Sequence, residues 1–176
     1  MLNCIEIGGG AMQVRFAIGQ DSHAFETDPD KQFKKPLVLG GIMFENMPCL
    51  AANSDGDVIL HAITNAVSGI TCRNILGGIA DEMCARGITD SSEYLRVALS
   101  DLSGIGGSIV SVSVSVEAKT PKFKNRIPEM RESIGKLLGI PSDRCGITAT
   151  TGEGLTAFGR GEGIAVFAAV TCSFGC

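Results

Sequence analysis

The sequence predicts a single domain of the α+β class, in which helices cover one face of a β-sheet. Residues 109–117 alternate valine with serine, as expected of a strand with one face in the core. Residues 163–173 are apolar at almost every position, which indicates a strand that is buried on both faces. Residues 57–68 have the period of a helix that is apolar around most of its circumference, so this helix is expected to be buried as well.

Helices on one side of a sheet leave its other side bare, so the strand at residues 163–173 needs a second cover. The chain is 44% hydrophobic and only 19% charged, yet no apolar run approaches the ~20 residues that cross a bilayer. We therefore expect a homo-oligomer in which the sheets of neighbouring copies pack together.

The 176 residues suit one domain at 13–176, preceded by a flexible leader at 1–12 that contains a Gly8-Gly9-Gly10 break. A net charge of -4 gives no overall attraction to nucleic acid or to an anionic membrane. The seven cysteines form no Cys-x-x-Cys pair, which favours free thiols in a reducing cytoplasm, and no targeting segment is evident.

The first half of the domain alternates strands with loops. Val14–Gly19 reads as a strand that ends in a loop containing Asp21-Ser22-His23, residues 27–35 as an exposed loop, and residues 37–44 as a hairpin about Gly40-Gly41. Residues 69–87 lack a clear period, and the pattern leaves open whether they cover a substrate or only connect elements.

The second half contains two more helices and two more strands. Asp90 and Glu93 form a capping box for one helix, and the other extends from about Ile127 to Gly139, a typical helix end. The remaining strands are expected at 146–151 and 163–173.

The helix at 57–68, capped by Ser54 or Asp55, carries one polar stripe along its surface. The stripe consists of Asp57, His61, Thr64, Asn65 and Ser68. A core histidine with satisfied hydrogen bonds is one interpretation of His61. The alignment of four other polar side chains with it favours a functional site.

The chain has only two histidines, His23 and His61. Together with Asp21 they would supply one carboxylate oxygen and two imidazole nitrogens, a set that suits tetrahedral zinc with its fourth position open to substrate or water. The alternative is two unrelated histidines, one at the surface and one in the core.

Two further motifs suit phosphate. Thr150-Thr151-Gly152-Glu153-Gly154 combines hydroxyls, a glycine backbone and a carboxylate that would face phosphate through a bridging cation, although an ordinary glycine turn has the same pattern. Arg160 can hold a phosphate with two parallel hydrogen bonds, or it can pair with Glu162.

In order and spacing, Asp21-Ser22-His23, the stretch from Asn53 to Ala62 and Gly159-Arg160-Gly161-Glu162-Gly163 resemble the 2-C-methyl-D-erythritol 2,4-cyclodiphosphate synthase family. The resemblance extends from about Arg15 to the last strand. It implies a phosphorus–oxygen lyase of non-mevalonate isoprenoid synthesis that converts 4-diphosphocytidyl-2-C-methyl-D-erythritol 2-phosphate to the cyclodiphosphate and releases CMP. It also implies a homotrimer with active sites between neighbours and an isoprenyl diphosphate site on the trimer axis, at Arg160 and Glu162.

The resemblance further implies one Zn2+ per subunit on Asp21, His23 and His61, and a Mg2+ or Mn2+ ion near Glu153 that is held through the phosphates. It assigns Asn53 and Thr151 to catalysis. The substrate contacts that it implies are Asp21, Ser22, His23, Asn53, Ser54, Ala118, Lys119, Thr120, Pro121, Lys122, Thr150, Thr151, Gly152, Glu153 and Arg160.

The sequence departs from the family pattern at four places. Asn53 stands where the family has a histidine that assists the transition state, Asn65 replaces an aspartate, and Gly154 replaces a lysine that contacts the nucleotide. Residues 74–77 replace a Gly-Asp-Ile-Gly whose aspartate holds the methylerythritol hydroxyls, a role that Asn74 would fill only if the loop shifted by one residue. We expect a lower rate than in the family.

Two other functions compete with the lyase. A zinc phosphohydrolase, with water at the fourth zinc position, would release inorganic phosphate, whereas cyclisation would not. A binding protein would keep the fold, the zinc and the axial site without turnover. Retention of the three zinc ligands together with Glu153 argues against a binding protein.

Overall fold

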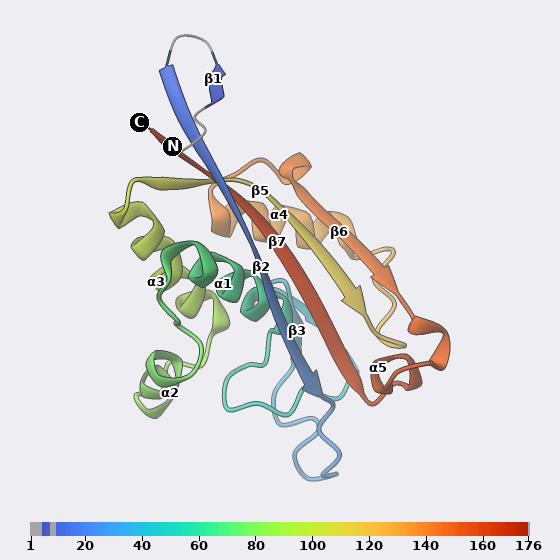
Figure 1. Cartoon of the computed structure of the whole chain (residues 1–176). Coiled ribbons are helices and arrows are strands. Elements are labelled where there is room, and N and C mark those ends of the chain that lie inside the picture. The colour runs from blue at the N-terminus through green and yellow to red at the C-terminus, as the bar shows by residue number, and fades with distance from the viewer. Residues whose placement is uncertain (1–4, 8–9, 176) are drawn as a thin grey trace.

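A five-stranded sheet in the order β1-β2-β7-β5-β6 is the frame of the computed structural model, which describes residues 5–7 and 10–175 (Figure 1). Its strands are β1 (Ile5–Ile7), β2 (Gly10–Ala24), β5 (Gly107–Glu117), β6 (Cys145–Thr150) and β7 (Gly163–Gly175). The β5–β6 pair is parallel and the other pairs are antiparallel. A separate hairpin joins β3 (Leu37–Leu39) to β4 (Ile42–Phe44), as the sequence predicts.

The main helices lie on one side of this sheet (Figure 1). They are α1 (Val58–Thr71), α2 (Gly78–Ala85), α3 (Ser91–Gly104) and α4 (Ile127–Leu138), and a short α5 (Ala157–Arg160) precedes β7. Two 3-10 turns, η1 (Ser142–Arg144) and η2 (Gly152–Gly154), flank β6. The α+β class is thus confirmed, with a mixed sheet. Among the described residues no helix is both long enough and apolar enough to cross a membrane.

Helix α1 is the central helix that the sequence predicts, but its cap differs from the prediction. Neither Ser54 nor Asp55 caps it. Asp57 does so, because its Oδ1 accepts hydrogen bonds from Ile59 N and Leu60 N, each at 3.1 Å. The same carboxylate accepts from the backbone of Gly40 and Gly41, which ties the β3–β4 turn to the start of α1. Burial raises the pKa of Asp57 to about 6, against the opposing effect of these donors.

The backbones of α1 and β2 touch at Gly19. A Cβ atom at this position would lie 2.1 Å from Ala62 O and 2.3 Å from Ala66 N, so only glycine permits the observed packing. One residue farther along β2, Gln20 O accepts a 2.9 Å hydrogen bond from Asn65 Nδ2 of α1. The contact and the hydrogen bond fix the height of α1 above the end of β2.

The two faces of the sheet differ in exposure. Side chains that face the helices, such as Val114 and Val166, are fully buried. On the opposite face of β2, Phe16 is 76% exposed and Ile18 is 67% exposed, and on β7 Phe167 is 49% exposed. In a single chain the second face of the last strand is thus open, with Phe167 on an apolar surface, and its burial by a neighbouring copy stays a prediction.

Several local predictions are confirmed. Asp90 caps α3 by accepting a hydrogen bond from Ser92 N, and α4 ends at Gly139 in the left-handed conformation. The capping box is confirmed only for Asp90, because the Glu93 carboxylate pairs with Arg96 instead. Residues 69–87, left open by their pattern, contain the end of α1 and the whole of α2. The expected leader at 1–12 lies partly outside the described residues. Where its backbone is described, residues 5–7 pair with β2, and the flexibility of the leader stays a prediction.

We predict that Gly19→Ala lowers the free energy of unfolding by ~3 kcal/mol, because the added methyl group meets helix backbone that cannot move without breaking hydrogen bonds. Gly104→Ala is the matched control, since a Cβ atom there meets nothing within 4 Å, and alanine favours the helix. Urea unfolding at one fixed protein concentration measures both variants. Equal stabilities of Gly19→Ala and the parent would show that the backbones of α1 and β2 are not in close contact at residue 19.

Candidate metal centre and substrate pocket

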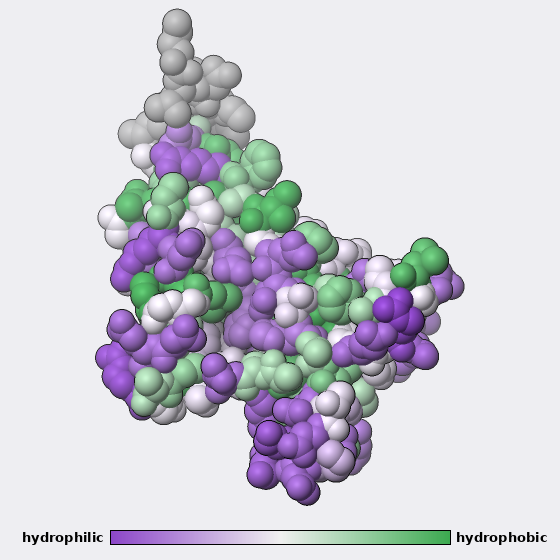
Figure 2. All heavy atoms as spheres, turned by 60° about the horizontal axis from the view of Figure 1, so that its bottom comes forward, coloured by the Kyte–Doolittle hydropathy of each residue, from purple (hydrophilic) through white to green (hydrophobic). Residues whose placement is uncertain are grey.

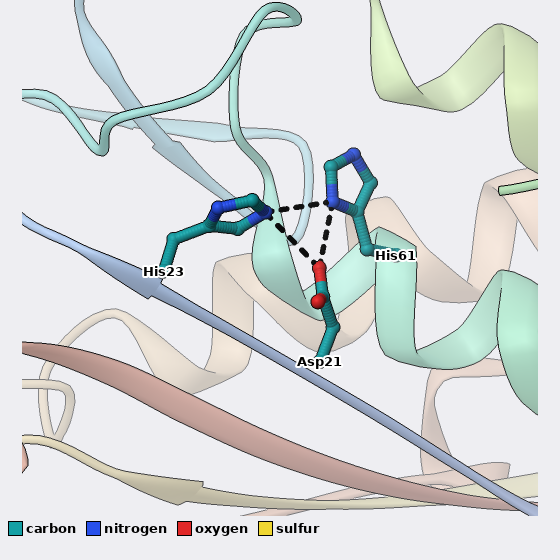
Figure 3. Close-up of side chains that lie close together, drawn as sticks. All are labelled: Asp21, His23 and His61. Atoms are coloured by element: carbon teal, nitrogen blue, oxygen red, sulfur yellow. Dashed lines mark hydrogen bonds and ion pairs between the residues drawn. The ribbon is translucent and has the colours of Figure 1, made fainter. Parts of the chain in front are cut away.

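Three side chains from two elements converge at the end of β2 (Figure 3). Asp21 Oδ2 lies 2.8 Å from His61 Nδ1 and 3.1 Å from His23 Nε2, and the two histidine nitrogens are 3.3 Å apart. The sequence predicts Asp21 and His23 in a loop after the strand, which is wrong because β2 continues to Ala24. As strand residues two apart they share one face, the face toward α1, where His61 stands in the first turn.

The geometry fits a metal ion. One ligand atom from each of Asp21, His23 and His61 lies within 4.8 Å of the other two, and a carboxylate with two imidazoles is a common donor set for zinc. Partial burial alone would raise the pKa of Asp21. Hydrogen bonds from the two histidines and their charge outweigh burial and hold this pKa well below its usual range, so the carboxylate is ionised.

Each histidine also has a partner on its outer nitrogen. His23 Nδ1 lies 3.1 Å from Ala51 O, and His61 Nε2 lies 2.8 Å from Ser91 Oγ. Such outer contacts orient the ring and decide which nitrogen is free for a metal. Ser91 was missed in the sequence because a serine at the start of a helix is ordinary.

The polar stripe of α1 does not face one common site. Asp57 is the cap, Thr64 Oγ1 donates to Leu60 O, and Asn65 bonds to β2. Of the stripe residues, His61 alone lies at the metal cluster. The position of His61 in the cluster agrees with a functional role. The alignment of the stripe residues, from which that role was inferred, does not reflect a common site.

A cavity of about 570 Å³ opens beside the cluster. Its lining residues are Asp21, His23, Glu26, Ala51, Ala52, Asn53, Ser54, His61, Leu76, Gly77, Ala80, Asp81, Cys84 and Tyr94. None of these described residues is lysine or arginine, whereas Glu26 and Asp81 add two carboxylates to that of Asp21. Ile75 is fully buried and Asn74 does not line the cavity, so the hypothesised shift that would bring Asn74 to the hydroxyls is not observed.

The other expected substrate residues lie elsewhere. Ala118, Pro121, Lys122, Thr150 and Thr151 line a second cavity, of about 330 Å³, at the ends of β5 and β6. Lys119, Thr151, Glu153 and Arg160 line a third, where Arg160 Nε pairs with Glu162 at 2.7 Å. Thr120 lies in the loop after β5, Gly152 begins η2, and Ser22 is exposed and turned away from the metal cluster.

The strand register gives the distance between the metal cluster and the second cavity. Asp21 pairs with Val166 of β7, which pairs with Val116 of β5, which pairs with Ala149 of β6. Three strand spacings, ~14 Å, therefore separate the metal cluster from the second cavity within one chain.

Figure 2, in which the bottom of Figure 1 is turned forward, shows the hydrophilic loop 27–35 as a lobe that projects from the rest of the molecule.

Comparisons with known proteins give a consistent result. The model of the YgbB family matches residues 14–173. The chain is 49% identical over 158 residues to the 2-C-methyl-D-erythritol 2,4-cyclodiphosphate synthase of Chlamydia trachomatis, which covers 89% of this chain and 86% of that protein.

Two solved structures share the fold. The bifunctional IspDF of Campylobacter jejuni has a TM-score of 0.82 at 29% identity, and the match covers 93% of this chain and 43% of that chain. The IspF of Plasmodium falciparum in a CDP complex has a TM-score of 0.78 at 25% identity, covering 93% of this chain and 97% of that one.

We predict that His61→Ala reduces bound zinc from one per chain to below 0.1, because two ligands hold zinc far more weakly than three. Ser68→Ala, two turns later on α1 and outside the cluster, is the control and is expected to keep its zinc, since Ser68 Oγ has no hydrogen-bond partner among the described residues. Plasma emission spectrometry of the dialysed proteins measures the metal. Full zinc content in His61→Ala would place the metal elsewhere.

Proposed function

The chain belongs to the YgbB family, and we propose that the Asp21, His23 and His61 cluster is the zinc site with which it carries out the reaction of that family. The reaction converts 4-diphosphocytidyl-2-C-methyl-D-erythritol 2-phosphate to 2-C-methyl-D-erythritol 2,4-cyclodiphosphate and releases CMP. The enzyme is thus a phosphorus–oxygen lyase of non-mevalonate isoprenoid precursor synthesis.

The observation that carries this proposal is the charge of the cavity. Asp21, Glu26 and Asp81 line it without a lysine or arginine among the described residues, and the substrate brings a diphosphate and a monophosphate. Anions of this charge do not bind beside three carboxylates without a cation. The metal cluster can bind such a cation, because Asp21, His23 and His61 all lie in the wall of the cavity.

Asp21, His23 and His61 would hold the zinc ion, which would supply Lewis-acid chemistry to the phosphate under attack. The nucleophile is the 2-phosphate of the substrate, which is already ionised, so the chain need not provide a general base. Asn53, on the rim of the same cavity, can donate a neutral hydrogen bond to a phosphate oxygen. Thr151 and a Mg2+ or Mn2+ ion near Glu153 are proposed to hold the diphosphate of the substrate, in which the bond to the α-phosphate breaks and CMP leaves.

The methylerythritol hydroxyls need an acceptor other than residue 75, since Ile75 is buried. Asp81 of α2 lines the cavity and has no cationic partner there. We infer that Asp81 accepts hydrogen bonds from these hydroxyls. Helix α2, which the sequence pattern does not reveal, would then carry a substrate contact.

We propose a homotrimer with each active site between two copies. Within one chain the zinc cluster and the cavity of Pro121 and Thr150 lie ~14 Å apart on different sides of β7. The open sheet face carries Phe16, Ile18 and Phe167, all largely exposed in a single chain. Packing of these faces would bury them and bring the zinc cluster of one copy to the cytidine cavity of the next.

Three smaller assignments accompany the trimer. The Plasmodium falciparum structure is a CDP complex, which supports a cytidine site at Ala118 to Lys122 and Thr150. Arg160 and Glu162 are proposed to meet an isoprenyl diphosphate on the trimer axis. The described cysteines Cys49, Cys72, Cys84, Cys145 and Cys172 are free, which supports a reducing, cytoplasmic location.

A phosphorus NMR time course with the cytidyl substrate tests the activity. We expect the diphosphate and monoester resonances to disappear while those of CMP and a cyclic diphosphate grow, with no inorganic phosphate. A phosphohydrolase would release inorganic phosphate, and a binding protein would leave the spectrum unchanged. Preincubation with a chelator is expected to stop the reaction, and added zinc to restore it.

We predict that Ile18→Glu converts the trimer to monomers, because it places a charge at the centre of an apolar face that a neighbouring copy would cover. Met43→Glu is the control, since Met43 is 54% exposed on the separate β3–β4 hairpin. Light scattering coupled to gel filtration gives the mass. A monomeric parent protein would refute the trimer, and a trimeric Ile18→Glu variant would show that the copies do not pack through this face.

A further inference from the structure

We propose that Asp55 and Ser91 form a buried hydrogen-bond relay that fixes the ring hydrogen of His61 on Nε2 and thereby keeps Nδ1 available to the metal. The relay assigns a positioning role to two residues that neither offer a ligand atom to the metal nor line its cavity. The inference rests on the metal centre proposed above. Helix α3 contributes no metal ligand, yet through Ser91 it determines which nitrogen of the ligand His61 carries the ring hydrogen.

The orientation of the His61 ring is the first step. Its Nδ1 faces Asp21 Oδ2 at 2.8 Å and His23 Nε2 at 3.3 Å, so Nδ1 is the ligand atom. Its Nε2 points the other way, to Ser91 Oγ at 2.8 Å. Ser54 Oγ is also near Nε2, but at 3.4 Å it is the weaker partner.

The hydrogen bonds of Asp55 give the relay its direction. Its carboxylate faces three hydrogen-bond donors: the Ser91 hydroxyl in a short contact, Ser91 N at 3.2 Å and Asp57 N at 3.1 Å. An ionised carboxylate only accepts, so the Ser91 hydroxyl donates its hydrogen to Asp55. Ser91 Oγ is then left with lone pairs toward His61, and the hydrogen between the two must belong to His61 Nε2.

Burial protects the hydrogen bond from His61 Nε2 to Ser91 Oγ. Ser91 is fully buried and His61 is 6% exposed, so water does not compete for the hydroxyl or for Nε2. Ser91 is the first residue of α3, and Asp55 N donates to Thr89 O at 2.8 Å, which clips the loop before α1 to the loop before α3. The serine therefore has little freedom to rotate away from the ring.

The other histidine shows the same arrangement with a different acceptor. His23 Nδ1 lies 3.1 Å from the carbonyl of Ala51, which leaves His23 Nε2 as its ligand atom. In both rings the outward nitrogen faces a fixed acceptor, so the inward nitrogen, which faces Asp21, is the one that a metal ion would take. Only in His61 does the acceptor belong to a side chain, so only there can a substitution remove it.

Zinc affinity tests the relay without reference to turnover. In competition with a chelating dye, Ser91→Ala is expected to weaken zinc binding about 10–100-fold, the range typical of outer contacts to metal ligands. Asp55→Asn should weaken it as well, because an amide offers one acceptor oxygen to three donors. The double variant should be no worse than Ser91→Ala alone, since Asp55 acts through Ser91. Ser92→Ala removes a buried hydroxyl from the same helical turn and should change affinity less than twofold.

Nitrogen NMR of the metal-free protein tests the tautomer itself. With only two histidines in the chain, the four ring nitrogens can be assigned by comparison with His61→Ala. We expect the parent His61 to carry a hydrogen on Nε2, and the Ser91→Ala ring to shift toward the form with its hydrogen on Nδ1, donated to Asp21. Thermal unfolding checks that each variant is folded.

The two tests separate failure of the relay from failure of the metal centre. A parent protein that binds zinc tightly, with Ser91→Ala binding it equally well, would overturn the relay and leave the centre standing. A bare Nε2 in the parent His61 would overturn the relay whatever the zinc result. A parent that binds no zinc would refute the centre, and the tautomer would still decide whether Ser91 orients the ring.

Discussion

The metal cluster depends on the contact between the backbones of α1 and β2 at Gly19. Because no Cβ atom separates them, the first turn of α1 reaches low enough for His61 to meet Asp21 and His23, which follow Gly19 on the same strand face. Asn65 bonds to Gln20 O and secures the helix against sliding along the strand. The ligands come from positions 21, 23 and 61, and this packing contact is what makes them neighbours.

Electrostatics then turns the cluster into a site for phosphate chemistry. Asp21 stays ionised between two imidazoles, and the adjoining cavity adds Glu26 and Asp81 but no lysine or arginine among the described residues. A cation bound at the cluster would convert this acidic wall into one that accepts phosphate. The Asp55 and Ser91 relay acts on the cluster from the side opposite the metal, because it determines which nitrogen of His61 faces the cation.

The sequence predicted what depends on local chemistry. Valine and serine alternation gave β5, the Asp90 cap gave α3, and Gly139 gave the end of α4. Asp21 was predicted in a loop because Gln20 and Ser22, polar on the other face, hide the alternation of β2. Helix α2 was missed because the Gly77-Gly78 pair precedes a segment without clear amphipathic period, and Ser91 because only the fold brings residue 91 to residue 61.

Anomalous diffraction at the zinc edge, on crystals of the unaltered protein, tests whether Asp21, His23 and His61 bind zinc. We expect one strong peak per chain, ~2.0–2.2 Å from Asp21 Oδ2, His23 Nε2 and His61 Nδ1, with a fourth position open to the cavity. A peak bound through the other nitrogen of His61, a peak at the free cysteines, or no peak after zinc is supplied would contradict it.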